Sequence, residues 1–377
     1  MERLSEGVIV TATSSISPGL TELGTAPLGV AIVGLGYWGP NLLRVLTENM
    51  EVDVRRLCDV DRARLQKYRR RAPRARVCTR FERVLSDPHV EAVIIATPVH
   101  THYPLAAEAL AAGKHVFVEK PLATSSLRAD ELAETAERNQ RILMCGHTFV
   151  YSPPVRAVKR MLEAGTLGEI YFVSCSRVNL GLHQRDVSVI WDLGPHDFSI
   201  LLYWLGELPT AVRAVGRDSI VKGIADVAFV TMSFASGIIA NVELSWLAPS
   251  KLRRTVLVGS ERMVIYDDGS SEPVRLFDRG VVYRDPETFG EYHLSYRSGD
   301  ILSPKIDSYE PLGLQLDDFV SAVRAEKPME FHSALARSVV RVVEAADRSL
   351  LDGGREVAVD GQDIGDQLTG RRELHVI

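Results

Sequence analysis

Three groups of residues have the types and spacing that chemistry at a bound cofactor requires. The first is the segment GLGYWG at residues 34–39, which follows a short apolar run and precedes a helix-like stretch. In that context Gly34 permits a tight turn, Gly36 lets the backbone approach a pyrophosphate, and Gly39 lets helix and strand pack closely. The free N–H groups at the start of the helix attract an anion. The segment predicts a dinucleotide site that also includes Tyr37 and Trp38.

One acidic residue indicates which dinucleotide is bound. Asp59 lies at the end of the second predicted strand, about 25 residues after Gly34. A carboxylate there accepts hydrogen bonds from the ribose hydroxyls and repels a 2′-phosphate, which favours NAD over NADP. Arg62 and Arg64 follow, and either could reach a 2′-phosphate. NAD is therefore the predicted cofactor, with NADP as the alternative.

The second group is Glu119 and Lys120, followed by Pro121 and directly preceded by the apolar strand His115–Val118. Ligands of open α/β sheets bind at the carboxyl ends of the strands. We therefore expect Glu119 and Lys120 at the cofactor crevice.

A neighbouring loop leaves the sheet at the same edge. It runs from Thr97 and Pro98 to His102, after the apolar run Ala92–Ala96. Two interpretations are equally good: the loop borders the nicotinamide, or it caps the helix that follows.

The third group is WDLGPHD at residues 191–197, ahead of an apolar helix predicted over Phe198–Leu205. Asp192 and His196 are four residues apart across a helix entrance, so both side chains can point into one cleft. Histidine is the usual general base near neutral pH. The alternative is that these residues are structural, with Asp192 or Asp197 as a helix cap and His196 as a core histidine. Capping is the stronger interpretation for Asp197.

The hydrophobic pattern predicts two kinds of domain to position these groups. Up to residue 150, short apolar runs alternate with helix-like segments, which is typical of a parallel, doubly wound sheet. From about Glu169, apolar and polar residues alternate, which indicates an open, mainly antiparallel sheet with one buried face. Helices over Leu316–Arg324 and Ser333–Leu350 finish the chain. We expect an N-terminal extension (1–28), a Rossmann dinucleotide-binding domain (29–150) and a C-terminal domain for substrate binding and oligomerisation (151–377).

Composition excludes several other classes of protein. The 377 residues are 46% apolar and 25% charged, as in ordinary globular domains. Basic residues number 44 against 49 acidic ones, so no nucleic-acid partner is expected. The basic segment 55–83 is interpreted as a solvated surface, with contact to a cofactor phosphate as the alternative. No apolar run approaches a membrane span, and no signal peptide is recognised.

The four cysteines are also informative. Cys58, Cys78, Cys145 and Cys175 have no CxxC spacing and lie in or beside apolar runs. They are interpreted as reduced, buried thiols of a cytoplasmic protein, without disulfides and without a metal site.

The segments GLGYWGPN, EKP and WDLGPHD, in this order, resemble the Gfo/Idh/MocA family of oxidoreductases from about Val30 to Leu350. ATPVHTHY, GHTFVYSP, NVELSWL and PKIDSYEPL resemble its sugar-nucleotide and amino-sugar branch. The resemblance implies that Lys120, Asp192 and His196 form the catalytic group. It also implies a cis bond between Lys120 and Pro121, and homodimers or homotetramers joined through the open sheet. The 28 leading residues are not part of the family pattern.

The expected reaction is hydride transfer between NAD(H) and a secondary hydroxyl or keto group of a sugar, sugar nucleotide, inositol or amino sugar. Neutral His196 would take the hydroxyl proton, and Lys120 would stabilise the alkoxide and lower the pKa of His196. Asp192 would orient His196 or hold a sugar hydroxyl. Two alternatives are an NAD-dependent glycosidase of the same family and a non-catalytic nucleotide-sensing protein.

Five polar residues on segments that lead into this site are expected to shape it for a polyhydroxylated ligand: Tyr151, Arg177, Asn179, His183 and Arg185. Arg177 or Arg185 could also hold a carboxylate or phosphate. The alternative for each is an exposed loop residue.

Overall fold

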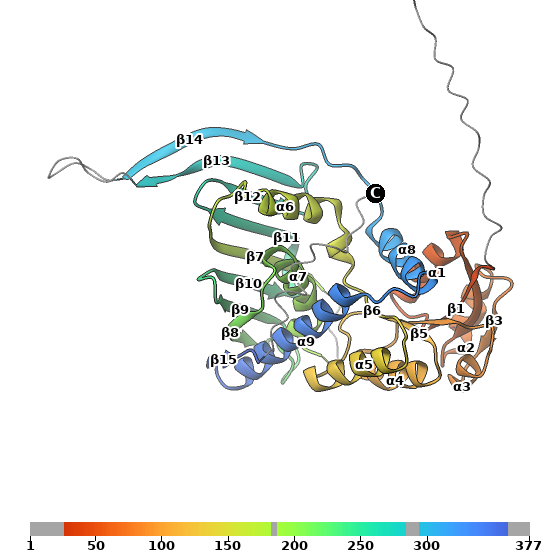
Figure 1. The fold of residues 1–377 in the computed structure, drawn as a ribbon. Helices are drawn as coiled ribbons and strands as arrows, with labels where there is room; N and C mark the ends of the chain where they lie inside the picture. Colours follow the sequence, from red (N-terminus) through yellow and green to blue (C-terminus); the bar gives the residue numbers. More distant parts are fainter. Residues whose placement is uncertain (1–25, 182–186, 284–293, 361–377) are drawn as a thin grey trace, which may run out of the picture.

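The computed structural model describes residues 26–181, 187–283 and 294–360, which form two sheets with helices between and around them (Figure 1). The first sheet has six parallel strands in the order β3-β2-β1-β4-β5-β6. Its strands are β1 (Leu28–Val33), β2 (Val52–Cys58), β3 (Arg76–Cys78), β4 (Ala92–Ile95), β5 (His115–Val118) and β6 (Leu143–Cys145). Its helices are α1 (Gly39–Glu48), α2 (Arg62–Arg69), α3 (Glu82–Leu85), α4 (His102–Ala111) and α5 (Ser126–Arg138).

The apolar runs of this sheet are fully buried, as the sequence predicts. Every residue of β1, β4, β5 and β6 is buried, because helices of a doubly wound sheet cover both faces. The strand order reverses between β1 and β4, so the loops after these two strands diverge and leave a crevice. β1 begins at Leu28, one residue inside the predicted extension, and the first 25 residues lie outside the described part.

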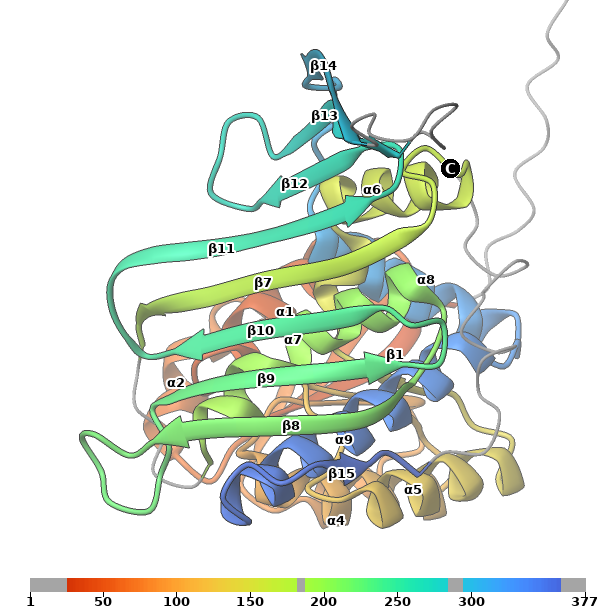
Figure 2. The ribbon, with the colours of Figure 1, turned by 90° about the vertical axis from the view of Figure 1, so that its left-hand side faces the viewer.

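The second sheet has nine strands in the order β14-β13-β12-β11-β7-β10-β9-β8-β15. They are β7 (Ile170–Leu180), β8 (Pro209–Arg217), β9 (Val227–Phe234), β10 (Ile239–Ser245), β11 (Leu247–Gly259), β12 (Met263–Asp267), β13 (Val274–Tyr283), β14 (Leu294–Leu302) and β15 (Val357–Ala358). All neighbours pair antiparallel except β7 and β10, which are parallel. Helices α6 (Pro153–Glu163) and α7 (Val189–Leu205) cover one face, and Figure 2 shows the other face open. The mainly antiparallel, one-sided sheet is confirmed.

The last two helices join the two halves. α8 (Pro311–Arg324) packs against α1 and the short helix η2 (Thr148–Tyr151), whereas α9 (Glu330–Leu351) packs against α7 and β8 on one side and α5 and β6 on the other. Asp130 of α5 accepts hydrogen bonds from Arg337 at 2.7 Å and Arg341 at 2.8 Å, both on α9. The C-terminal helices therefore contact both sheets.

Helix α7 differs from its prediction at the N-terminal end. It begins at Val189 rather than Phe198, so the WDLGPHD segment lies within the helix and Pro195 is in its interior. Proline lacks the N–H that would bond to the carbonyl of Trp191. A Gly-Pro pair is therefore typical of the end of a helix, and from the sequence alone the helix is expected to begin after it. Asp197 is consequently not a helix cap, because Ser188 occupies that position.

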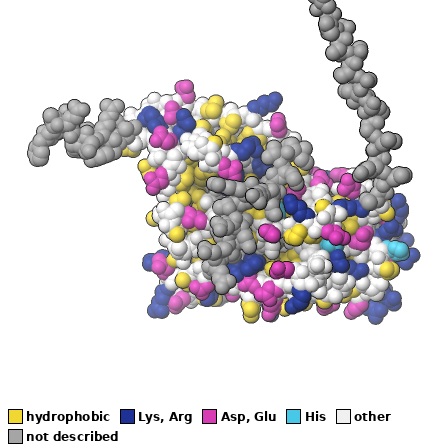
Figure 3. Space-filling view, in the orientation of Figure 1, with side chains coloured by type: hydrophobic (Ala, Val, Ile, Leu, Met, Phe, Trp, Pro, Cys, Tyr) yellow, Lys and Arg dark blue, Asp and Glu magenta, His cyan; other side chains and the backbone are white. Residues whose placement is uncertain are grey.

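The basic segment 55–83 lies on the outside of the first sheet. Leu65 is the only buried residue of α2, and Figure 3 shows Lys and Arg side chains along this edge of the molecule. In the same part of the chain, Cys58 is buried and Cys78 is half-buried, and both are free thiols. Within the described residues no helix is both long and apolar enough to cross a bilayer.

Candidate active site

A cleft of about 1580 Å³ lies between the two sheets. It starts at the carboxyl ends of β1, β2 and β4, passes the loop after β5, and reaches α7 and Arg253 of β11. The cleft therefore connects the crevice of the parallel sheet with the second domain, so one ligand can contact both.

The glycine loop has the shape that a dinucleotide needs. Gly34 has a φ of +92°, and a Cβ there would lie 2.4 Å from the carbonyl oxygen of Ala96. A Cβ on Gly39 would lie 2.1 Å from the carbonyl oxygen of Gly34, whereas the nearest atom to a Cβ on Gly36 is Arg64 Nη1 at 3.7 Å. Packing thus requires Gly34 and Gly39, whereas a Cβ on Gly36 would only make an ordinary van der Waals contact with the end of the Arg64 side chain. The start of α1 has no side-chain cap, which leaves backbone N–H groups for an anion.

Asp59 directly follows β2 and lines the cleft at the carboxyl edge of the sheet. Its Oδ2 accepts the N–H of Leu35 at 2.7 Å, and its Oδ1 accepts the N–H of Asp61 at 2.8 Å. Each carboxylate oxygen can accept a further bond, so ribose hydroxyls can still bind. Arg64 lines the cleft 3.8 Å from Asp59, whereas Arg62 does not line it.

His102 connects two loops at the carboxyl edge of the sheet. The ring is buried, with Nδ1 2.7 Å from the carbonyl oxygen of Pro121 and Nε2 2.9 Å from that of Thr97. Thr97, Pro98 and His102 all line the cleft. The loop after β4 therefore borders the crevice, and its histidine fixes the position of the loop that carries Lys120.

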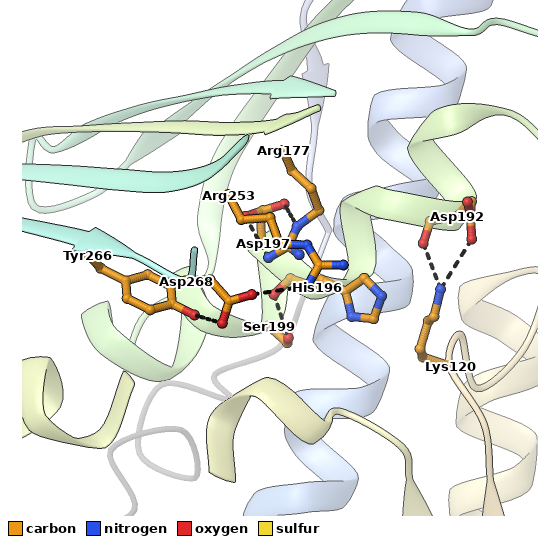
Figure 4. Close-up of polar contacts among 9 residues, drawn as sticks. All are labelled: Lys120, Arg177, Asp192, His196, Asp197, Ser199, Arg253, Tyr266 and Asp268. Atoms are coloured by element: carbon orange, nitrogen blue, oxygen red, sulfur yellow. Dashed lines mark hydrogen bonds and ion pairs between the residues drawn. The ribbon is translucent and has the colours of Figure 1, made fainter. Parts of the chain in front are cut away.

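Glu119 and Lys120 have different environments although they are adjacent. Glu119 is buried, and burial raises its pKa to about 7 against the opposing effects of Lys120 and Trp38. The bond between Lys120 and Pro121 is cis, as the resemblance implies. Lys120 Nζ donates to the backbone oxygen of Asp192 at 2.7 Å and lies 3.3 Å from Asp192 Oδ1 (Figure 4).

Asp192 positions Lys120 rather than His196. Its Oδ1 faces Lys120, and its Oδ2 accepts the indole N–H of Trp246 at 3.0 Å. Because Lys120 belongs to the first domain and Asp192 to α7, this ion pair joins the two sides of the cleft.

His196 lies one turn further along α7 and lines the same cleft. Its ring packs edge-on against Phe149, with centroids 5.0 Å apart. Burial holds the pKa of His196 well below its usual value, and the charges of Lys120 and Arg177 lower it further. The imidazole is therefore neutral at neutral pH and able to accept a proton.

Two of the residues predicted to contact substrate are structural instead. Arg177 is buried and pairs with Asp197 through Nε–Oδ2 at 2.5 Å and Nη2–Oδ1 at 3.2 Å. Tyr151 is also buried, and its hydroxyl donates to Asp318 at 2.8 Å and lies 3.1 Å from His332 Nε2. Both predictions are wrong, because partners distant in sequence bind these polar groups in the core.

Asn179 does line the cleft, as predicted, and His183 and Arg185 lie outside the described residues. Several other residues that line the cleft were not predicted from the sequence, among them Phe149, Trp191, Trp246, Arg253 and Asp268. Arg253 lies in β11, in the half of the strand where exposed polar residues interrupt the apolar pattern. The described residues contain no cluster of three or more His, Cys, Asp or Glu side chains that could hold a metal ion.

Comparisons with known proteins agree with this arrangement. The family model described as "Oxidoreductase family, NAD-binding Rossmann fold" (GFO_IDH_MocA) matches residues 28–147, and the model of the GFO/IDH/MocA C-terminal domain matches residues 155–265. Together the two matches include Lys120, Asp192 and His196.

Individual relatives are 27–30% identical to this chain. UDP-N-acetylglucosamine 3-dehydrogenase of Acidithiobacillus ferrooxidans is 27% identical over 253 residues, which are 67% of this chain and 76% of that protein. Inositol 2-dehydrogenase 2 of Saccharopolyspora erythraea is 29% identical over 227 residues, 58% of this chain and 66% of that protein. The crystal structure of GenD2 from gentamicin A biosynthesis in complex with NAD has a TM-score of 0.76 and 30% identity, covering 91% of this chain and 100% of GenD2.

Proposed function

The chain belongs to the Gfo/Idh/MocA family of NAD-binding oxidoreductases. On that basis we propose that it catalyses hydride transfer between NAD(H) and a secondary hydroxyl or keto group of a sugar-like substrate, with Lys120, Asp192 and His196 as the catalytic group. The observation that carries the proposal is the Lys120–Asp192 ion pair beside a neutral histidine in the cleft that the glycine loop opens. The relatives named above support a sugar, sugar nucleotide, inositol or amino sugar as the substrate.

The residues at the glycine loop fit NAD. The absence of a side chain at Gly36 and the uncapped start of α1 suit a pyrophosphate, and the remaining acceptor sites of Asp59 suit the ribose hydroxyls. When bound, NAD accepts the hydride of the substrate at its nicotinamide ring. Arg64 is balanced by Asp59 and Asp61, at 3.8 Å and 3.5 Å, which favours NAD over NADP.

In the proposed reaction, side chains of the protein accept the proton of the substrate hydroxyl and stabilise the negative charge that develops on its oxygen. Neutral His196 accepts the proton of the reacting hydroxyl, because its depressed pKa keeps the imidazole unprotonated. Lys120 provides a fixed cation for the negative charge that develops on the substrate oxygen. Asp192 and Trp246 hold Lys120 in place.

A substrate screen tests the proposal. Wild-type protein with NAD is assayed against sugars, sugar nucleotides, inositols and aminoglycosides by the absorbance of reduced nicotinamide. Net accumulation separates this function from a glycosidase, which regenerates its NAD. The variant Lys120→Met should lose about 10²–10⁴-fold in turnover, with thermal unfolding little changed.

The control is Lys222→Met, since Lys222 is 93% exposed and pairs only locally with Asp218. Its turnover should match that of the wild type. Unchanged turnover in Lys120→Met would overturn the assignment.

We also propose that the open face of the nine-stranded sheet joins copies of the chain. Its apolar side chains are about half exposed: Phe172, Val215, Phe229 and Ile239. Strand register places Val215 beside Phe229 and Phe172 beside Ile239, so they form apolar pairs on one face. Such a patch is typical of a protein–protein contact.

A further inference from the structure

A second ion pair faces His196 from the side opposite Lys120 and Asp192 (Figure 4). Arg253 of β11 and Asp268, directly after β12, both line the cleft, and Arg253 Nη1 lies 3.0 Å from Asp268 Oδ2. About a third of each side chain is exposed. His196 is therefore placed between two ion pairs, one at the cofactor side and one at the sheet side.

The sheet-side pair is held in place by its surroundings. The N–H of Asp268 donates to the carbonyl oxygen of Arg253 at 3.0 Å, and the hydroxyl of Tyr266 donates to Asp268 Oδ1 at 3.3 Å. The guanidinium of Arg253 also lies over the ring of Phe149, 5.7 Å from its centroid. Such preorganisation is what a recognition site requires.

Among the residues that the structure describes, the cationic side chains of the cleft are all paired. Each Lys or Arg that lines it has a carboxylate partner: Arg44 with Glu48, Arg64 with Asp59, Lys120 with Asp192, and Arg253 with Asp268. An anionic substrate group at Arg253 would lie beside the charge of Asp268 and be repelled by it. Two neighbouring hydroxyls fit better, because Asp268 can accept from one while Arg253 donates to the other.

We propose that Arg253 and Asp268 are the specificity residues of this site and bind two neighbouring hydroxyls of an uncharged sugar ring whose reacting carbon lies at His196. The inference rests on the proposed function, since it names the substrate class for the same cleft. Trp38 and Trp191 also line the cleft, and both are partly exposed. Aromatic side chains with a polar edge suit the apolar faces and hydroxyls of a sugar ring.

The test compares Asp268→Asn and Arg253→Lys with the wild type. Glucose, myo-inositol and UDP-N-acetylglucosamine are the probes with an uncharged ring, and glucuronate is the acidic probe. For the best uncharged ring, each variant should raise KM about tenfold and change kcat much less. Asp268→Asn should also increase the use of glucuronate relative to glucose, because Arg253 is then free to bind a carboxylate.

The matched control is Asp278→Asn. Asp278 pairs with Arg262 at 3.5 Å and Arg297 at 3.3 Å on the same sheet but does not line the cleft. KM should not change in this variant, and thermal unfolding of all three variants checks that they are folded. Unchanged KM in Asp268→Asn, or a wild type that prefers glucuronate to glucose, would overturn the inference.

Failure of the proposed function gives a different result. In that case wild-type protein forms no reduced nicotinamide with any probe. Specificity is then measured as the thermal stabilisation of NAD-loaded protein by the same four probes. Loss of stabilisation by the uncharged rings in Asp268→Asn supports the inference, whereas the same stabilisation as in the wild type refutes it.

Discussion

At the scale of single residues, the environment of His196 determines its protonation. Burial and the neighbouring charges of Lys120, Arg177 and Arg253 all oppose the imidazolium form, and they hold the pKa of His196 well below 6.5. The unfolded chain therefore binds this proton more readily than the folded one. The contribution of neutral His196 to the free energy of unfolding is therefore complete above pH 6.5. This contribution is lost progressively as the pH falls below 6.5, because the unfolded chain then binds a proton that the folded chain does not bind.

The pH dependence of catalysis follows from this shift. We expect no inflection from His196 near pH 6.5 in the pH profile of kcat/KM for alcohol oxidation. The fall in kcat/KM that accompanies protonation of His196 should occur only at lower pH. Glu119 titrates at about 7, so pH–rate profiles are measured for the wild type and for Glu119→Gln. An inflection near 6.5 that persists in Glu119→Gln would contradict the predicted state of His196.

The Arg177–Asp197 pair leads to a stability prediction. Asp197→Ala leaves the guanidinium of Arg177 buried without its carboxylate, which should cost about 3–5 kcal/mol in the free energy of unfolding. Asp278→Ala, which removes a half-exposed carboxylate, should lower the free energy of unfolding by about 1 kcal/mol or less. Urea unfolding of both variants checks the difference, and equal losses would argue against a structural role for Asp197.

Residue roles could be predicted from the sequence only where the local context was sufficient. Lys120 follows a buried strand at the carboxyl edge of a parallel sheet, and Asp192 and His196 are four residues apart at a predicted helix entrance, so a common cleft could be expected for them. Arg177 and Tyr151 could not be assigned in this way. Their partners Asp197 and Asp318 are decided by packing between distant segments, which a single sequence does not contain.

At the scale of elements, the three glycines of the loop after β1 are expected to have different roles, because two are required for packing and one for NAD binding. Gly34→Ala and Gly39→Ala place a Cβ 2.4 Å and 2.1 Å from backbone oxygens and should lower the unfolding temperature. Gly36→Ala has room for its methyl group, so it should unfold like the wild type and yet bind NAD more weakly. Thermal unfolding and NAD titration measure the two effects. Wild-type NAD affinity in Gly36→Ala would show that the pyrophosphate does not approach this residue.

Elements were predictable where one signal dominated. β5 coincides with its predicted bounds, because a short, continuously apolar run at this place leaves one interpretation. The start of α7 was missed because Gly194 and Pro195 are typical of helix ends, whereas packing keeps them inside this helix. The bounds of α2 could not be predicted from the sequence, because its single buried residue gives no helical period.

At the scale of the whole molecule, α9 makes the two halves one unit. It packs against α5 and β6 as well as α7 and β8, so the C-terminal helices hold Lys120 and His196 on facing sides of one cleft. The alternating pattern predicted the second sheet, but it carries no information about which elements of the first domain α9 contacts. That contact depends on tertiary packing alone.

The open sheet face gives the prediction at this scale. Phe229→Glu places a charge among the apolar pairs of this face and should shift the protein from an oligomer to a monomer in sedimentation velocity. Lys222→Met, on the loop between β8 and β9, serves as the control and should leave the oligomer intact. Unchanged sedimentation of Phe229→Glu would exclude this face as the contact.

The most direct measurement of the proposed reaction follows deuterium from substrate to cofactor. Protein, NAD and the substrate found in the screen, deuterated at all carbon-bound positions, should give reduced nicotinamide that carries deuterium. Lys120→Met and His196→Asn should form it about 10²–10⁴-fold more slowly. Reduced nicotinamide without deuterium, or wild-type rates in both variants, would contradict hydride transfer at this site.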